Sequence, residues 1–244
     1  MTPRKEEFEE KEKEDTTTDL DHEKSRDVVV PGEVLAKGKD ILPGEGTRRE
    51  GEEIVSSRFG LLDKTDRLVK VIPLSGAYIP RAGNTVIGQI VDVNFNGWNI
   101  DVLSTYDAFL PVMECFGYIN KKDLTEVYDF NDILVVKIRA VKPRSIELTM
   151  KEKGLKKLEG GMLIKINSAR VPRIIGKAGS MVKTIKDETN CNIIVGQNGL
   201  VWIKGEHVED EIIAKKAIEL IAEKPFEGGL TEKIKEFLEK HKKK

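Results

Sequence analysis

Residues 171–189 read Val-Pro-Arg-Ile-Ile-Gly-Lys-Ala-Gly-Ser-Met-Val-Lys-Thr-Ile-Lys-Asp-Glu-Thr, and this stretch decides the fold of the C-terminal half. It predicts a short helical turn over 171–175, because a proline such as Pro172 is tolerated near the start of a helix. A second helix is predicted over 180–189, where apolar side chains recur on one side. Residues 176–179 are the loop between them.

The segments around this stretch complete a mixed α/β unit. A strand is predicted at 162–166, and two more at 192–195 and 200–204, which form a hairpin around Asn198-Gly199. Apolar residues at helical spacing predict a further helix over 208–223. The predicted order is therefore β-α-α-β-β-α.

The loop Gly176-Lys177-Ala178-Gly179 has the chemistry of a phosphate-binding turn. Its two glycines lack a Cβ, so a nucleic-acid backbone can approach closely. It leads into the helix that starts at Ser180, where free N–H groups and the helix dipole favour an anion. Lys177 adds a positive charge. The alternative is a tight turn between two packed helices with no ligand.

Bases would lie over an apolar groove beside the loop. We expect the walls of this groove to be Ile175, Ile185 and Ile194. The predicted RNA-binding residues of this unit are therefore Ile175, Gly176, Lys177, Ala178, Gly179, Ser180, Ile185 and Ile194.

The part of the chain from Thr85 to about Met150 predicts a small β-barrel. Asn96-Gly97 is a strong hairpin signal, and residues 133–141 alternate apolar and polar side chains as a half-buried strand does. About five strands in so short a segment suit a closed barrel of the OB type. Upstream, strands are expected over 54–62 and 67–74, with no helical period, which predicts a small all-β domain.

The predicted fold class is multidomain, with a β domain, a β-barrel and an α/β domain. The expected domains are an acidic disordered tail (1–27), an N-terminal β domain (28–80), the barrel (81–152), the α/β domain (153–227), and a C-terminal helix with a lysine-rich end (228–244). The apolar face of this last helix needs a partner, either the α/β domain or a neighbouring molecule.

The charge is unevenly distributed along the chain. With 41 basic and 42 acidic residues the formal net charge is −1, which by itself argues against a nucleic-acid binder. Residues 1–27 hold 6 basic and 11 acidic residues, so the remaining chain has a basic excess. Eight of its basic residues cluster within 137–157, where Glu147 and Glu152 are the only acidic ones. This cluster predicts a basic stripe, with a solvated strand edge as the alternative.

Several classes of protein are excluded or disfavoured by the sequence. No apolar stretch approaches the length of a membrane span, and the acidic start does not resemble a signal peptide. Cys115 and Cys191 are far apart and are expected to be free thiols in a reducing cytoplasm. His22, His207 and His241 share no metal-binding spacing. We find no catalytic motif, and we expect no metal and no cofactor.

The combined motifs resemble a known family. Residues 161–225 resemble a KH domain of type I, whose Gly-x-x-Gly loop clamps about four nucleotides of single-stranded RNA. Residues 83–152 are similar to an S1-type OB domain. A short β domain followed by these two resembles the RNA-binding cap subunit of the archaeal exosome, of the KH type rather than the zinc-ribbon type. The anchors are Val30-Pro31-Gly32-Glu33, Gly97-Trp98 with Leu110-Pro111-Val112, and the Gly176–Gly179 loop.

This resemblance implies a non-catalytic subunit that binds single-stranded RNA and guides 3′ ends into a pore. It implies a hexameric ring of phosphorolytic RNase PH-like subunits as partner, with the domain at 28–80 docking to the ring, and other cap subunits in a trimeric cap. Two alternatives stay open. One is a free-standing S1/KH protein linked to translation or RNA processing, and the other is a phosphorolytic nuclease.

The barrel departs from the family at its base-stacking positions. Many S1 domains carry an aromatic-Gly-x-aromatic hairpin, whereas here Asn96 and Asn99 flank Gly97-Trp98. RNA contacts of the barrel are therefore expected to be mainly electrostatic, through Lys137, Arg139, Lys142 and Arg144. Tyr106 and Phe109 are candidates for stacking on bases, with core or loop packing as the alternative.

Overall fold

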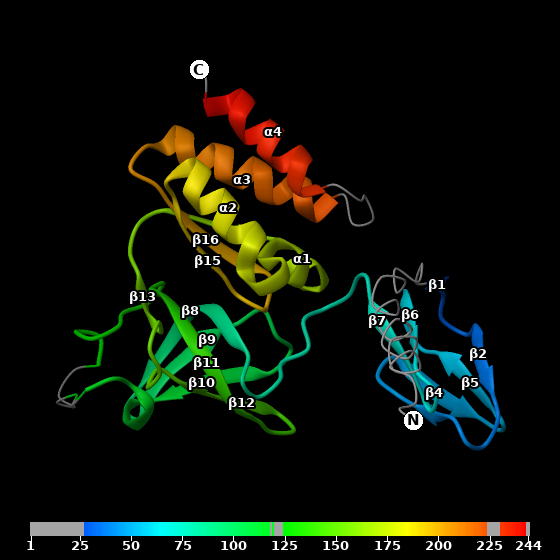
Figure 1. Ribbon diagram of the computed structural model, residues 1–244. Helices are drawn as coiled ribbons and strands as arrows, with labels where there is room; N and C mark the ends of the chain where they lie inside the picture. The colour runs from blue at the N-terminus through cyan, green and yellow to red at the C-terminus, as the bar shows by residue number, and fades with distance from the viewer. Residues whose placement is uncertain (1–26, 118, 120–123, 224–229, 243–244) are drawn as a thin grey trace, which may run out of the picture. The chain divides into compact units, whose positions relative to one another are not determined.

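The computed structural model describes residues 27–117, 119, 124–223 and 230–242 (Figure 1). The predicted acidic tail lies almost entirely outside the described residues. The chain divides into two compact units, one ending at Pro73 and the other beginning at Leu74. Each unit is described by itself.

The first unit consists of two small β-sheets. One sheet has the order β1 (Val28–Val29), β6 (Gly60–Lys64), β7 (Leu68–Pro73) and β3 (Leu42–Pro43). The other has the order β2 (Val34–Lys37), β5 (Glu53–Ser56) and β4 (Thr47–Glu50). The small buried core of this unit contains Ala36, Ile54 and Val69.

The predicted strand over 54–62 is wrong, because the chain changes sheets within it. Strand β5 ends at Ser56, whose buried hydroxyl donates to the carbonyl of Arg58 at 2.6 Å and so turns the backbone. The next strand starts at Gly60, where a Cβ would lie 2.3 Å from the carbonyl oxygen of Ile72. The apolar pattern is interrupted at the break by the polar run Ser56-Ser57-Arg58, which was the signal that could have marked it.

The second unit begins with a closed β-barrel. Its strands are β8 (Thr85–Asn94), β9 (Gly97–Asp101), β10 (Asp107–Pro111), β11 (Ile133–Val141) and β12 (Ser145–Thr149). The parallel pairing of β10 with β12 and the antiparallel pairings of β11 with β12 and β8 close the barrel, as the sequence predicts. A short 3₁₀ turn, η1 (Val112–Glu114), follows β10.

Alternation along the strands fills the barrel. On β11, the alternate residues Leu134, Val136 and Ile138 are buried in the barrel core. Trp98 is fully buried, and its indole N–H donates to the carbonyl of Tyr128 at 2.8 Å. Strand β13 (Lys156–Leu158), which the sequence boundary at 153 assigns to the following domain, pairs with β11 instead.

The α/β part of the second unit has the predicted order. Strands β14 (Met162–Lys165), β16 (Leu200–Lys204) and β15 (Asn192–Val195) form an antiparallel sheet in that order. Turn η2 (Ser168–Arg170) leads into α1 (Val171–Ile175), and η3 (Lys177–Gly179) leads into α2 (Ser180–Thr189). Helices α2 and α3 (Val208–Glu223) pack on one face of the sheet (Figure 1).

The C-terminal helix belongs to this same core. Helix α4 (Leu230–Lys242) packs against α2 and α3 (Figure 1). Ile234 and Leu238 are buried in the cluster that the sheet and helices share. Of the two partners expected from its apolar face, the structure selects the α/β domain of the same chain.

The barrel and the α/β sheet are joined through a second apolar cluster. It contains Ile87 and Val135 of the barrel together with Leu158 of β13 and Leu200 and Trp202 of β16. The hairpin turn of β15 and β16 adds polar contacts, since the amide of the buried Asn198 donates to the carbonyls of Ile87 at 2.7 Å and Val102 at 2.9 Å. Its side-chain oxygen accepts from the N–H of Ile87 at 3.3 Å.

Strand lengths explain why Ile87 needs this partner. On one side of β8, the neighbouring strand β9 ends at Asp101, which pairs with Gln89. Ile87 therefore lies beyond the end of β9 and has no strand partner on that side. A buried backbone amide without a ladder partner must be satisfied by a side chain or by water. Asn198 satisfies it from a position 111 residues away in sequence.

Both cysteines are free and buried, which leads to a first prediction. Burial raises the pKa of the Cys115 thiol to about 12, with the nearby Glu114 as a second cause, and burial also raises the pKa of Cys191. Because the thiolate is the reactive form, we expect alkylation at pH 8 to be at least about a hundredfold slower in the native protein than in urea. Mass spectrometry after timed labelling measures this ratio, and equal rates would contradict the burial of these thiols.

Within the described part of the chain, no helix combines the length and apolar character that a membrane span requires. Nor do the residues described there include a group of three or more His, Cys, Asp or Glu side chains that could hold a metal ion.

Candidate nucleic-acid interface

The loop between α1 and α2 is held in a conformation that depends on its glycines. Gly176 has φ 75° and Gly179 has φ 79°, both in the region that favours glycine, and Ala178 between them has φ 52°. The N–H of Gly176 donates to the carbonyl of Pro172 at 2.9 Å, which ends α1. The loop therefore turns sharply between the two helices.

The two glycines have different roles. A Cβ on Gly176 would lie 2.7 Å from the Cβ of Met181, so this glycine is required for packing. A Cβ on Gly179 would have no neighbour within 4 Å. Gly179 thus leaves an open approach to the backbone, which is what a bound phosphodiester would need.

The surroundings of the loop favour an anion. Lys177, Ala178 and Ser180 are exposed. Helix α2 starts directly after Gly179, which has no side chain to cap the first N–H groups of the helix. These groups carry the positive end of the helix dipole. The loop and the helix start can therefore present N–H donors and the ammonium group of Lys177 to one phosphate.

The three predicted groove isoleucines do not line one surface. Ile175 is half-buried at the end of α1. Ile185 is fully buried in the core between sheet and helices, so the prediction that it contacts a base needs correction. Ile194 is half-buried and packs toward the barrel cluster, because Ile193 takes the helix-facing position of β15 and side chains alternate along a strand.

Two arginines next to the loop were missed by the sequence reasoning. Arg170 ends η2 and Arg173 lies in α1, and both are half-buried. Burial and the neighbouring charge of Arg170 lower the pKa of the Arg173 guanidinium. Their positions three residues apart, on either side of Val171-Pro172, could have indicated a basic group at the start of α1.

The basic stripe of the barrel is largely paired with carboxylates. Lys137 contacts Glu152 at 2.6 Å and Arg139 contacts Glu114 at 3.1 Å. Further pairs join Lys142 to Glu147, Lys151 to Glu114 and Lys157 to Asp132. The hydrogen bond from Lys142 lowers the pKa of the Glu147 carboxyl. Arg144 has no ion pair with any residue that the structure describes.

These ion pairs lie at the surface, although the Glu114 and Asp132 side chains are partly buried, and surface pairs typically contribute less than about 1 kcal/mol. A phosphate can therefore compete for these cations, but the stripe is less basic than a count along the sequence indicates. Glu114 and Asp132 come from outside 137–157, and the folding of the barrel brings them to the stripe.

The aromatic side chains of the barrel differ in how accessible they are. Tyr106 is exposed, and Phe109 is half-buried on the outer face of β10 opposite Asn99 and Glu147. Two rings that the sequence reasoning missed are far more accessible, since Phe95 is 97% and Phe116 is 81% exposed.

The backbone brings the segments that carry these two rings together. The N–H of Val112, at the start of η1, donates to the carbonyl of Asn96 at 2.9 Å. Phe95 precedes Asn96 at the tip of the β8–β9 hairpin, and Phe116 follows η1 by two residues. The position of Phe95 next to the Asn96-Gly97 turn was the signal that could have identified it.

Comparisons with known proteins agree with this domain order. Residues 26–75 match the family described as "Exosome RNA binding protein RRP4 N-terminal domain", and residues 161–209 match the KH domain family. A solved structure described as a candidate exosome complex RNA-binding protein is similar to this chain with 34% identity and a TM-score of 0.63, covering 69% of this chain and 98% of its own.

Curated relatives extend the similarity over nearly the whole chain. Exosome complex component Rrp4 of Methanothermus fervidus is 45% identical over 88% of this chain and 96% of its own length. The Thermococcus kodakarensis protein of the same name is 42% identical over 88% of this chain and 86% of its own length. With this identity and coverage, the chain belongs to the archaeal exosome complex component Rrp4 family.

Proposed function

We propose that this chain is a non-catalytic RNA-binding subunit of the archaeal exosome that binds single-stranded RNA for 3′-to-5′ degradation or tailing. The observation that carries the proposal is the open Gly176–Gly179 loop of a KH domain, in a chain of the Rrp4 family. The loop and the start of α2 hold the phosphates, with Lys177 as the cation.

The barrel supplies further contacts along the RNA. Arg144 contacts phosphates directly. Three paired cations can also do so once they leave their weak ion pairs with carboxylates: Lys137, Arg139 and Lys142. Phe95 and Phe116 offer accessible faces on which bases stack without sequence preference. These contacts guide a 3′ end toward active sites that lie in other subunits.

The N-terminal unit has a surface suited to docking on other subunits. We propose that the N-terminal unit docks to a hexameric ring of phosphorolytic RNase PH-like subunits, together with other cap subunits in a trimeric cap. In support, this small unit exposes several apolar side chains that a partner could cover: Val28, Val30, Val34, Leu42, Phe59 and Leu68. Localisation of the protein in the cytoplasm is a further prediction, which cell fractionation would check.

Co-purification and binding at two salt concentrations test the proposal together. We expect the tagged chain to retain phosphorolytic ring subunits from an archaeal extract. With about four phosphate contacts, affinity for single-stranded RNA should fall roughly 50-fold between 50 and 200 mM salt. The pure chain should leave labelled RNA intact in the presence of phosphate and Mg²⁺.

Each alternative would give a different result. RNA binding without ring subunits would favour a free-standing RNA-binding protein. Phosphate-dependent shortening of the RNA by the pure chain would favour a nuclease. An affinity that does not change with salt would contradict binding of RNA through its phosphates, whichever of these functions holds.

A further inference from the structure

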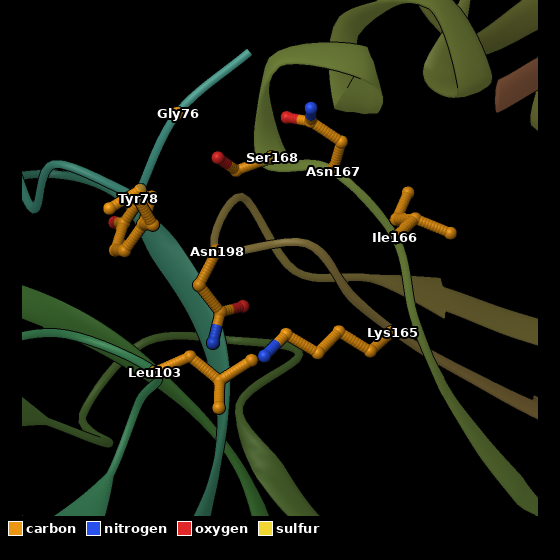
Figure 2. Close-up of a pocket in the computed structure, with 9 residues that line it drawn as sticks. Gly76, Tyr78, Leu103, Lys165, Ile166, Asn167, Ser168 and Asn198 are labelled. Atoms are coloured by element: carbon orange, nitrogen blue, oxygen red, sulfur yellow. The ribbon is translucent and has the colours of Figure 1, made fainter. Parts of the chain in front are cut away.

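A cleft of about 440 Å³ lies within the second unit, between the barrel and the KH sheet (Figure 2). Its lining comes from the segment before β8, from the end of β9, from the segment that links β14 to η2, and from the β15–β16 turn. The residues are Gly76, Ala77, Tyr78, Leu103, Lys165, Ile166, Asn167, Ser168 and Asn198.

Two of the polar side chains in the cleft are already engaged. The amide of Asn198 bonds to the barrel backbone on both its oxygen and its nitrogen. The hydroxyl of Tyr78 donates to the side-chain oxygen of Asn84 at 2.8 Å. These groups form fixed walls and are not available to a ligand.

The remaining polar groups are hydrogen-bond donors. Lys165, at the end of β14, has no ion pair or side-chain hydrogen bond with any described residue, and the same holds for the hydroxyl of Ser168. The side-chain oxygen of Asn167 accepts from the N–H of Ala169 at 3.0 Å, which leaves its NH₂ group as a donor. Figure 2 shows Lys165 reaching across the cleft toward Leu103 and Asn198.

This set of groups fits an anion with an apolar neighbour. An ammonium, a hydroxyl and an amide NH₂ can all donate to the oxygens of a phosphate. Leu103, Ile166 and the ring of Tyr78 provide apolar walls of the kind that pack against a sugar or a base.

We propose that this cleft binds one nucleotide of a single-stranded RNA, with its phosphate held by Lys165 and a separate hydrogen bond donated by Ser168. Turn η2 leads directly into α1, whose five residues span about 7.5 Å and end at Gly176. One RNA strand can therefore contact both the Gly176–Gly179 loop and the cleft. The proposal rests on the proposed function and adds a second binding point to it.

The test compares Lys165→Glu with Lys216→Glu. Lys216 lies on α3, on the helix-covered side of the KH sheet, is exposed, and has no ion pair with a described residue, so its reversal makes the same change of charge away from the cleft. Two RNAs are used, one of about four nucleotides, enough for the loop, and one of about twelve.

Lys165→Glu should reduce affinity for the longer RNA about tenfold and make its dependence on salt shallower by about one phosphate contact. Affinity for the short RNA should stay within about twofold of wild type. Ser168→Ala should weaken binding of the longer RNA by a few fold, which supports the cleft independently of charge.

Equal losses in Lys165→Glu and Lys216→Glu would overturn the cleft, and so would an equal loss for both RNAs. Failure of the wild-type chain to bind either RNA would instead contradict the proposed function. Thermal melting of each variant checks that the fold is intact, and both lysines are exposed, so no change is expected.

Discussion

Gly179→Asp should reduce the affinity of the folded protein for single-stranded RNA by about a hundredfold, equivalent to about 2.7 kcal/mol. The change places a carboxylate at the open side of the loop, where a Cβ has no neighbour within 4 Å. The carboxylate repels the phosphate and competes for the N–H groups at the start of α2. Fluorescence anisotropy with a labelled RNA measures the loss.

Gly179→Asn is the matched control for this prediction. Asparagine has almost the same shape and the same tolerance of positive φ, without the charge. It should lose far less affinity than Gly179→Asp. If the two variants bind RNA equally well, or if Gly179→Asp binds like wild type, the loop is a structural turn. Gly176→Ala is not suited to this test, since its Cβ would press on Met181 and disturb the fold.

Asn198→Leu should lower the free energy of unfolding by about 3 kcal/mol, because it leaves buried backbone groups without partners. The N–H and carbonyl of Ile87 and the carbonyl of Val102 would lose the bonds that the amide provides. The loss weakens the connection between the barrel and the KH domain. We therefore expect thermal unfolding in calorimetry to split into two transitions.

Gln197→Leu is the control, in the same turn and with a similar change of side chain. The side chain of Gln197 is exposed, and its contact with the barrel is made by its backbone N–H, which donates to the carbonyl of Thr85 at 2.9 Å. This variant should unfold like wild type. A loss in Gln197→Leu as large as in Asn198→Leu would contradict the role of the Asn198 amide.

The parts of the fold that depend on local pattern could be predicted from the sequence. Helices α2 and α3 and the β15–β16 hairpin occur over the predicted residues, because apolar period and turn chemistry act within a few residues. The strand predicted over 54–62 failed because the change of sheet depends on the Ser56 hydroxyl and the close packing of Gly60. The polar run Ser56-Ser57-Arg58 interrupts the apolar pattern at this point and was the one local sign of the break.

Features that depend on distant contacts could not be predicted. Arg139 and Glu114 are 25 residues apart, so the pairing that reduces the charge of the stripe is not visible along the chain. Asn198 was recognised only as a turn residue, although its partners lie 96 and 111 residues away. Ile185 matched the expected apolar groove by type, but its place on the inner side of α2 buries it.

Under the proposed mode of RNA binding, the Asn198 contact has a consequence for how affinity depends on RNA length. Since it fixes the KH domain to the barrel, the span between the Gly176–Gly179 loop and the barrel surface is set by the fold and not by a flexible linker. A strand long enough to bridge this span would gain its second contact at high effective concentration, whereas a shorter strand would gain none. Under the proposed mode of binding, the second unit would therefore distinguish RNA ends by the number of unpaired nucleotides they offer.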